Sequence, residues 1–327
     1  MKTFVFTCGD INGIGPEIVI KSLNRVAVRS KNKFIFVCPR NVFLNQIKST
    51  EPKFNFEICT SNYFMNYQTV SVINFGDAVQ ELGRPTVHSG KTAYKALKIA
   101  FDLIRNSNVC TLITAPISKT GFSLAGIKYP GHTEMLADWC NVINYAMMFL
   151  SKPMKAALMT IHVPIKKVSQ SISQKNLEAK FNLLLHTLIN DFGISSPRIA
   201  VLGLNPHAGE NGLIGDEEKR VLIPFMKKYA HKKYFYGPFP SDGFFGTKTY
   251  LKYDLVLGMY HDQILNPFKL LNFNKGVNYT SGLPIVRTSP DHGTAFEIAG
   301  KNIADESSMI EAYKFAGIIM NNRNINA

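Results

Sequence analysis

The sequence lacks paired cysteines, a long apolar run and the common dinucleotide-binding fingerprint. Its five cysteines are odd in number and form no CxxC pair, which excludes an ordinary disulfide framework and favours buried free thiols in a reducing compartment. No run of about 18 apolar residues occurs, so no transmembrane helix is expected. The apolar stretch near the N-terminus is too short for a signal peptide, and we expect a cytoplasmic protein.

Acidic residues are scarce as well. There are 23 Asp and Glu against 37 Lys and Arg, which leaves a formal net charge of +14. Such an imbalance raises the possibility of nucleic acid or another anionic partner. The lysines are scattered in small clusters and form no stripe with stacking aromatics, so we expect no nucleic-acid partner. A zinc hydrolase is disfavoured because no HExxH motif supplies a base.

What the sequence does contain is an alternation of short apolar runs and longer amphipathic segments. With 327 residues, 46% of them hydrophobic, the chain is long enough for about two domains. The pattern predicts strands at residues 3–8, 33–38, 69–75, 109–114, 155–163, 198–204 and 254–260. It predicts helices at residues 16–23, 42–47, 89–104, 176–192, 216–229 and 309–320, the fourth of them ended by Gly193. This alternation predicts an α/β protein with a largely parallel sheet.

Three histidines directly follow predicted strands. His162, His207 and His261 each come after an apolar run, and strand ends are where ligands gather in α/β sheets. Three neutral imidazoles suit a borderline divalent metal such as Zn²⁺. The same positions are equally compatible with histidines that merely lie in loops, because spacing alone does not separate the two interpretations.

Cations and amides follow the last of these histidines. Lys269, Asn278 and Arg287 lie in a segment rich in Gly, Pro and aromatic residues, and Arg287 is suited to bidentate binding of a phosphate or carboxylate. Asp242 and Asp262 are candidates for acid–base catalysis, although carboxylates in turns are often only caps. The Gly-rich turn at residues 9–17 either holds an anion or is simply a tight strand-to-helix turn.

Six motifs in order carry a family resemblance. They are GDxxGIGPE (9–17), TAPISK (114–119), YPGHTE (129–134), LNPHAGE (204–210), YHDQ (260–263) and RTSxDHGTA (287–295). Together they resemble the PdxA family, the 4-hydroxythreonine-4-phosphate dehydrogenases of pyridoxal phosphate biosynthesis. The likeness extends from about residue 3 to the last predicted helix.

The resemblance implies a fold and an assembly. The fold is like that of isocitrate and isopropylmalate dehydrogenases, with two α/β domains and a central cleft. Residues 1–125 plus 270–327 would form the cofactor-side domain, and residues 126–269 the domain for metal, substrate and dimerisation. A homodimer is implied, with active sites at the interface.

The resemblance also implies a reaction. The substrate 4-phosphooxy-L-threonine would be oxidised with NAD or NADP and then decarboxylated to 3-amino-2-oxopropyl phosphate. Alternatively, the substrate is another phosphorylated hydroxy acid, 4-phospho-threonate or 4-phospho-erythronate. The phosphorylated substrate would be the small-molecule partner, and no membrane partner is implied.

Residue roles follow from the matched motifs. A divalent metal (Zn, Mg or Co) would be held by His162, His207 and His261. Substrate contacts would come from His132, Thr133, Lys269, Asn278 and Arg287. The cofactor would contact Asp291, His292, Gly293 and Thr294. The proton-transfer residue stays open among Asp242, Asp262 and His132.

Two motifs depart from the usual family pattern. The first usually reads GDPAGIGPE, whereas Ile11 and Asn12 stand here. The cofactor block usually reads HGTAxDIAGKG, whereas Glu297 replaces the Asp and Asn302 replaces the last Gly. The second departure leaves the preference between NAD and NADP open.

Overall fold

The computed structural model describes residues 1–28, 30–60, 70–107 and 110–325. These residues form two compact units: Met1–Asn141 with Leu283–Asn324, and Val142–Gly282. The domain limits that the family resemblance implies, 1–125 with 270–327 and 126–269, stay a prediction. Each unit is described below by itself.

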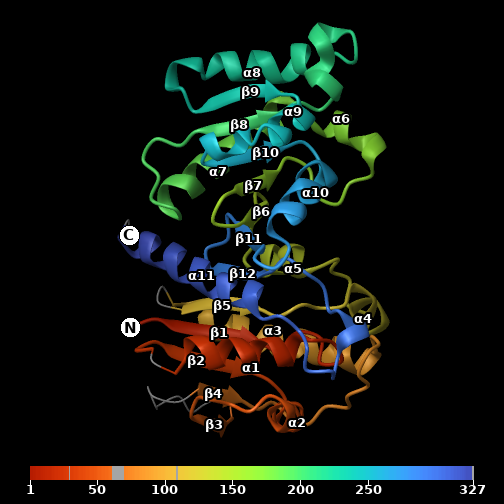
Figure 1. Cartoon of the computed structure of the whole chain (residues 1–327), viewed down its shortest axis with the longest axis vertical. Helices are drawn as coiled ribbons and strands as arrows, with labels where there is room; N and C mark the ends of the chain where they lie inside the picture. The colour runs from red at the N-terminus through yellow and green to blue at the C-terminus, as the bar shows by residue number, and fades with distance from the viewer. Residues whose placement is uncertain (29, 61–69, 108–109, 326–327) are drawn as a thin grey trace. The chain divides into compact units, whose positions relative to one another are not determined.

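The first unit is a parallel sheet covered by helices (Figure 1). Its strands are β1 (Thr3–Thr7), β2 (Lys33–Val37), β3 (Phe56–Cys59), β4 (Val70–Ile73), β5 (Cys110–Thr114) and β12 (Val286–Pro290), in the order β3-β4-β2-β1-β5-β12. Its helices are α1 (Gly15–Val26), α2 (Arg40–Ser49), α3 (Val87–Ile104), α4 (Lys119–Leu124), α5 (His132–Trp139) and α11 (Ser307–Ile325). The central strands are buried on both faces, as parallel strands with apolar runs should be.

The last helix of the chain closes the core around the first strand. Figure 1 shows the blue helix α11 beside the red strand β1, and the ring of Tyr313 lies 4.5 Å from that of Phe4. Lys2 donates a hydrogen bond to the carbonyl of Gly317 at 3.2 Å. The first and last segments of the sequence therefore belong to one core.

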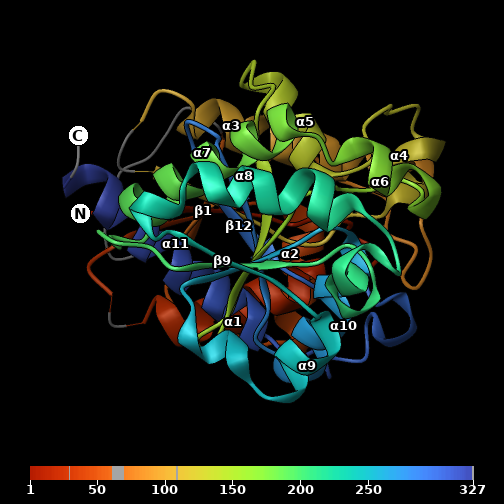
Figure 2. The same cartoon turned by 90° about the horizontal axis from the view of Figure 1, so that it is seen from above.

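The second unit contains a mixed sheet. Its strands are β6 (Ala146–Leu150), β7 (Lys155–Leu158), β8 (Ile199–Leu202), β9 (Phe235–Phe239), β10 (Leu255–Gly258) and β11 (Val277–Ser281), in the order β11-β6-β7-β10-β8-β9. Its helices are α6 (Val168–Ser171), α7 (Gln174–Asn190), α8 (Ile223–Lys228), α9 (Ser241–Gly246) and α10 (His261–Asn272). β6 is antiparallel to both of its neighbours, whereas β7, β10, β8 and β9 are parallel. Figures 1 and 2 both show α8 lying along β9.

The predicted elements match the observed ones except at their ends. The strand expected at 155–163 ends at Leu158, and His162 near its expected end has φ of +48°, which an extended strand does not allow. The helix expected at 216–229 begins as a π-helical turn at Glu218 and becomes α-helical only at Ile223, where Pro224 has no amide hydrogen to give to a preceding turn. Residues 69 and 109, the first residues of two predicted strands, lie outside the described residues.

Two further predictions concern α7 and membrane spans. Gly193 has φ of +67° and its amide bonds the carbonyl of Ile189, so it stops α7 as predicted. Among helices in the described part of the chain, none is long and apolar enough to span a membrane.

Candidate functional site

Two of the three predicted metal-binding histidines come together at the ends of β7 and β10. These strands are parallel neighbours, and hydrogen bonds continue past their ends: the amide of Met159 donates to Gly258, and the hydroxyl of Thr160 donates to the carbonyl of Met259 at 2.7 Å. The rings of His162 and His261 consequently lie 6.0 Å apart. Their proximity agrees with the rule that the ends of parallel strands share one edge of a sheet, and their role as metal ligands stays a prediction.

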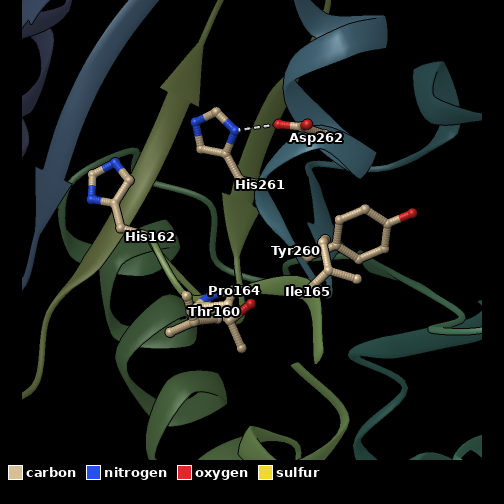
Figure 3. A pocket seen from close by; sticks show the side chains of 8 residues that line it. Thr160, His162, Pro164, Ile165, Tyr260, His261 and Asp262 are labelled. Carbon is tan, nitrogen blue, oxygen red and sulfur yellow. Dashed lines mark hydrogen bonds and ion pairs between the residues drawn. The ribbon is translucent and has the colours of Figure 1, made fainter. Parts of the chain in front are cut away.

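The two histidines border a pocket of about 230 Å³ (Figure 3). Its lining consists of Thr160, His162, Val163, Pro164, Ile165, Tyr260, His261 and Asp262. Nδ1 of His261 lies 2.7 Å from Oδ1 of Asp262. When Nδ1 carries the proton, Nε2 keeps its lone pair for a metal, and the carboxylate fixes the orientation of the ring.

The third histidine lies apart from this pocket. His207 is exposed on the irregular helical turn Pro206–Gly212, where five consecutive residues adopt left-handed backbone angles. It does not line the pocket. No group of three His, Cys, Asp or Glu side chains close enough to hold a metal occurs within residues 1–28, 30–60, 70–107 and 110–325. The structure therefore brings two of the three predicted ligands together.

The other site residues predicted in the second unit have different settings. Asp262 lines the pocket, whereas Asp242 is exposed in the first turn of α9 and is not among its lining residues. Lys269 lies in α10 and Asn278 in β11, both half-buried. The sequence predicted neither α10 nor β11. Pro267 lies inside α10, and a proline normally argues against a helix at that position.

In the first unit, Arg287 is a buried cation on β12. It is 2% exposed, and its Nε and Nη2 donate to Oγ1 of Thr114 at the end of β5, at 3.0 and 2.7 Å. Burial lowers the pKa of Arg287 to about 9, while the negative charge of Glu134 opposes that shift. The guanidinium therefore stays charged at neutral pH. A buried cation is costly unless an anion accompanies it.

His132 faces the same cation. It is the first residue of α5, and its Nε2 is a buried atom without a hydrogen-bond partner among the residues that the structure describes. Burial, and then the positive charge of Arg287, lower the pKa of His132 well below 6.5. Thr133, the next residue, is buried as well. An orphaned imidazole nitrogen, a buried guanidinium and a helix N-terminus together form a setting that an anion would satisfy.

The lowered pKa of His132 predicts a pH dependence of stability. The native state keeps His132 neutral while the unfolded chain takes up a proton near pH 6.5, so the unfolded state binds more protons below that pH. The free energy of unfolding should hence fall as the pH falls below about 6.5, by at most about 1.4 kcal/mol per pH unit. Urea unfolding from pH 8 to 5.5 measures this slope.

The matched variant for that experiment is His132→Asn, which keeps a polar side chain but cannot titrate. Between pH 6.5 and 5.5, its free energy of unfolding should fall less steeply than that of the wild-type protein, by about 1 kcal/mol per pH unit, which corresponds to about 0.7 of a proton. Equal slopes in the two proteins would show that His132 does not titrate in this way.

The segment predicted to bind the cofactor is firmly anchored in the first unit. The amide of Ile14 donates to the carbonyl of Thr294 at 3.0 Å, and a Cβ on Gly13 would lie 2.6 Å from the same oxygen. Glu17 accepts from the amide of Ala304 and from Lys21, both at 2.8 Å. The Gly-rich turn at 9–17 therefore supports residues 294–304 by close packing. Asp291 and His292 are half-buried and Gly293 is exposed.

Both departures from the family pattern make contacts that the sequence did not predict. Asn302, with φ of +56°, donates to the carbonyl of Ser49 and accepts from the hydroxyl of Thr50, both at 2.7 Å. The buried Asn12 accepts from the amide of Glu81 at 2.8 Å and donates to the carbonyl of Arg84 at 3.0 Å. Each asparagine joins two segments distant in sequence, so no local pattern announces its role.

The comparison with known families decides the relationship. Residues 20–316 match the family described as "Pyridoxal phosphate biosynthetic protein PdxA". The chain belongs to the PdxA family. Within it, the chain is 39% identical to a 4-hydroxythreonine-4-phosphate dehydrogenase of Bacteroides thetaiotaomicron, over 97% of this chain and 88% of that one. It is 37% identical to a D-threonate 4-phosphate dehydrogenase of Salmonella typhimurium, over 96% and 98% of the two chains.

Solved structures agree with membership in the PdxA family. A 4-hydroxythreonine-4-phosphate dehydrogenase from Klebsiella pneumoniae superimposes with a TM-score of 0.82 at 35% identity, covering 98% of each chain. An isocitrate dehydrogenase from Methylococcus capsulatus gives 0.51 at 12% identity, covering 99% of this chain and 87% of that one, and shows the fold alone. The predicted fold class is thereby confirmed, and this PdxA-family chain is a dehydrogenase.

Proposed function

We propose that this chain oxidises the hydroxyl of 4-phosphooxy-L-threonine with a nicotinamide cofactor, after which the product loses CO₂ to give 3-amino-2-oxopropyl phosphate. Membership in the PdxA family supports the reaction class. The observation that carries the substrate assignment is the buried Arg287 beside the orphaned Nε2 of His132. A phosphorylated hydroxy acid has the anionic groups that a guanidinium and an imidazole N–H donor can bind together.

His132 and Arg287 would act on the substrate by binding and orienting it. The guanidinium offers a planar fork to a phosphate or carboxylate, and the neutral imidazole offers an N–H donor to the same group. Thr133, Lys269 and Asn278 would add contacts to the rest of the substrate. Burial and the charge of Arg287 lower the pKa of His132 and so oppose its protonation, which favours Asp242 and Asp262 over His132 as the base.

The donor set at the pocket fits a borderline divalent metal. Two adjacent imidazoles, His162 and His261, are nitrogen ligands that suit Zn²⁺ or Co²⁺ better than Mg²⁺, which prefers oxygen. His207 would supply the third ligand. When bound, such a metal acts as a Lewis acid that lowers the pKa of a substrate hydroxyl. Asp262 would hold His261 in the ligating tautomer.

The cofactor would lie against residues 291–294. Thr294 at its end accepts from the amide of Ile14, and the residues just after it are held by Glu17 and Lys21 of α1, which bond Asn302 and Ala304. We propose NAD in preference to NADP. Glu297 is exposed just after this segment in the chain, and its negative charge would disfavour the additional phosphate of NADP.

A substrate panel tests the reaction. Purified protein, with Zn²⁺ or Co²⁺ added or withheld, is assayed for NADH and NADPH formation with 4-phosphooxy-L-threonine, 4-phospho-D-threonate and 4-phospho-D-erythronate. We expect metal-dependent turnover with the highest kcat/KM for the amino acid. Absence of turnover under every condition would overturn the proposal. A higher kcat/KM for D-threonate 4-phosphate would favour the second function, which the Salmonella typhimurium relative carries in its name.

We further propose that the chain forms a homodimer through the end of α10. Leu270 and Phe273 are 87% and 76% exposed, and Leu271 lies between them. Three apolar side chains exposed within four residues mark a surface that a second copy would cover. The cytoplasmic location and the lack of a nucleic-acid partner stay predictions from the sequence.

The dimer proposal predicts the effect of charge at this surface. The double variant Leu270→Asp/Phe273→Asp should sediment as a monomer at micromolar concentration, where the wild-type protein sediments as a dimer, because charges at an interface core oppose burial. Leu251→Asp, at a site 57% exposed elsewhere in the second unit, is the control and should stay dimeric. A wild-type protein that is monomeric at all concentrations would refute the proposal.

A further inference from the structure

The loop that carries His207 is folded around one buried carboxylate, Glu218. Its side chain is 2% exposed. Oε1 accepts from the backbone amides of Leu204 and Asn205 at 2.7 and 2.8 Å, and Oε2 accepts from the side-chain amide of Asn205 at 2.9 Å. A single carboxylate thus bonds three N–H groups of the segment that leads into His207.

The loop is also packed tightly onto this carboxylate. A Cβ on Gly209 would lie 2.7 Å from Oε2 of Glu218, and Gly209 has φ of +81°. A Cβ on Gly215 would lie 2.5 Å from the amide of Asn205. These two glycines, both of which follow His207 in the chain, therefore allow the backbone to close around Glu218 and Asn205.

Further hydrogen bonds join the segment before His207 to the end of β10, which His261 follows, and to α6, which comes after His162 in the chain. Gln263 accepts from the amide of Met259 at 2.7 Å and donates to the carbonyl of Gly203 at 2.6 Å, which ties the end of β10 to the end of β8. Glu217 accepts from the amide of Asn205 and from the hydroxyl of Ser169, in α6 beyond His162. All three histidine-bearing segments thus share one hydrogen-bond network.

We propose that Glu218 is a positioning residue that sets the place of His207 relative to the other two histidines. Five successive left-handed residues from His207 to Asn211 are a conformation that side chains disfavour, and it persists only where surrounding contacts impose it. Glu218 supplies those contacts at the start of the loop. Its role is therefore to hold the third ligand where a metal can recruit it, and the inference rests on the proposed metal site.

The test uses the whole protein and Co²⁺ as the probe. Glu218→Ala removes all three acceptor bonds and should weaken Co²⁺ binding at least about tenfold, as loss of a ligand-orienting group commonly does. Amide hydrogen exchange at Leu204 and Asn205 should accelerate in the same variant. Glu218→Gln keeps one acceptor oxygen for the backbone amides and should restore Co²⁺ affinity to within about threefold of wild type.

Asp216→Ala is the matched control. Asp216 is an exposed acid two residues earlier, paired only loosely with Arg220 at 3.6 Å. The Asp216→Ala substitution removes one negative charge, as Glu218→Ala does, but it removes none of the contacts that Glu218 makes with the loop. Co²⁺ affinity should therefore stay at the wild-type value. A loss of affinity in this control equal to that in Glu218→Ala would reduce the effect to net charge and overturn the inference.

The remaining outcomes separate the inference from the function on which it rests. Wild-type Co²⁺ affinity and an unchanged visible Co²⁺ spectrum in Glu218→Ala would overturn the inference alone. Failure of the wild-type protein to bind Co²⁺ would overturn the proposed metal site and, with it, the purpose given to Glu218. The inference would also be overturned if amide hydrogen exchange at Leu204 and Asn205 were as slow in Glu218→Ala as in the wild-type protein.

Discussion

Replacing Arg287 with alanine is expected to lower kcat/KM for the phosphorylated substrate by roughly 10²- to 10³-fold. The guanidinium is buried, lies beside His132, and is the strongest anion-binding group that the first unit places there. Truncating one member of a buried, hydrogen-bonded charge pair costs about 2–5 kcal/mol of binding, and each 1.4 kcal/mol is about tenfold. Steady-state kinetics with saturating cofactor and metal measure this loss.

The same substitution should destabilise the fold. Arg287→Ala removes the two N–H groups that donate hydrogen bonds to Oγ1 of Thr114. It also removes the positive charge that interacts with the carboxylate of Glu134. Breaking a buried pair by removing one partner costs about 3–5 kcal/mol. Kinetics must therefore be measured where urea unfolding shows that the variant is fully folded.

Arg287→Lys separates charge from geometry. A lysine keeps the positive charge but offers one ammonium in place of the two donors that meet Thr114. Its kcat/KM should lie between those of the wild type and the alanine variant. Arg25→Ala removes an exposed arginine from the same unit and should leave kinetics unchanged. A KM for substrate within threefold of wild type in Arg287→Ala would show that the anion binds elsewhere.

The parts of the site that sequence predicted are those governed by local rules. Short apolar runs located β1, β2, β4, β5, β7, β8 and β10 but missed β3, β6, β9, β11 and β12. A polar residue at a strand end is expected at one edge of a parallel sheet. That reasoning brought His162 and His261 together, since β7 and β10 are parallel neighbours. Arg287 was selected by residue type alone, because its fork suits an anion, and its substrate role stays a prediction.

The parts it missed depend on contacts between distant segments. His207 follows β8 as predicted, yet a run of left-handed residues and the buried Glu218 decide where its loop goes. Asn302 and Asn12 looked like simple departures from a motif, whereas each bonds a segment far away in sequence. No periodicity or turn signal encodes such pairings, because both partners are set by tertiary packing.

The second large effect is expected at His261. Replacing it with alanine removes one of two adjacent imidazoles at the pocket and should lower metal-dependent turnover on the order of 10³-fold, since even loss of a group that only supports a ligand costs about 10- to 100-fold. Stability should change by less than about 0.5 kcal/mol because the side chain is 44% exposed. Co²⁺ titration, turnover and urea unfolding measure the three quantities.

Two further variants show what His261 does. Asp262→Asn keeps the imidazole but weakens its 2.7 Å partner, and should cost about 10-fold in Co²⁺ affinity. His231→Ala, on the exposed turn Ala230–Lys232, is the matched histidine control and should behave as wild type. NADH binding, measured by its fluorescence, should be unchanged in all of them.

Combining His261→Ala with His162→Ala or His207→Ala then tests whether the three histidines act as one unit. Ligands of a single metal are grossly non-additive: once one is removed and the metal is lost, removing another costs little more. Turnover in each double variant should therefore match that of His261→Ala alone. If the losses multiply instead, the histidines act independently, and the metal site proposed for this pocket would be wrong.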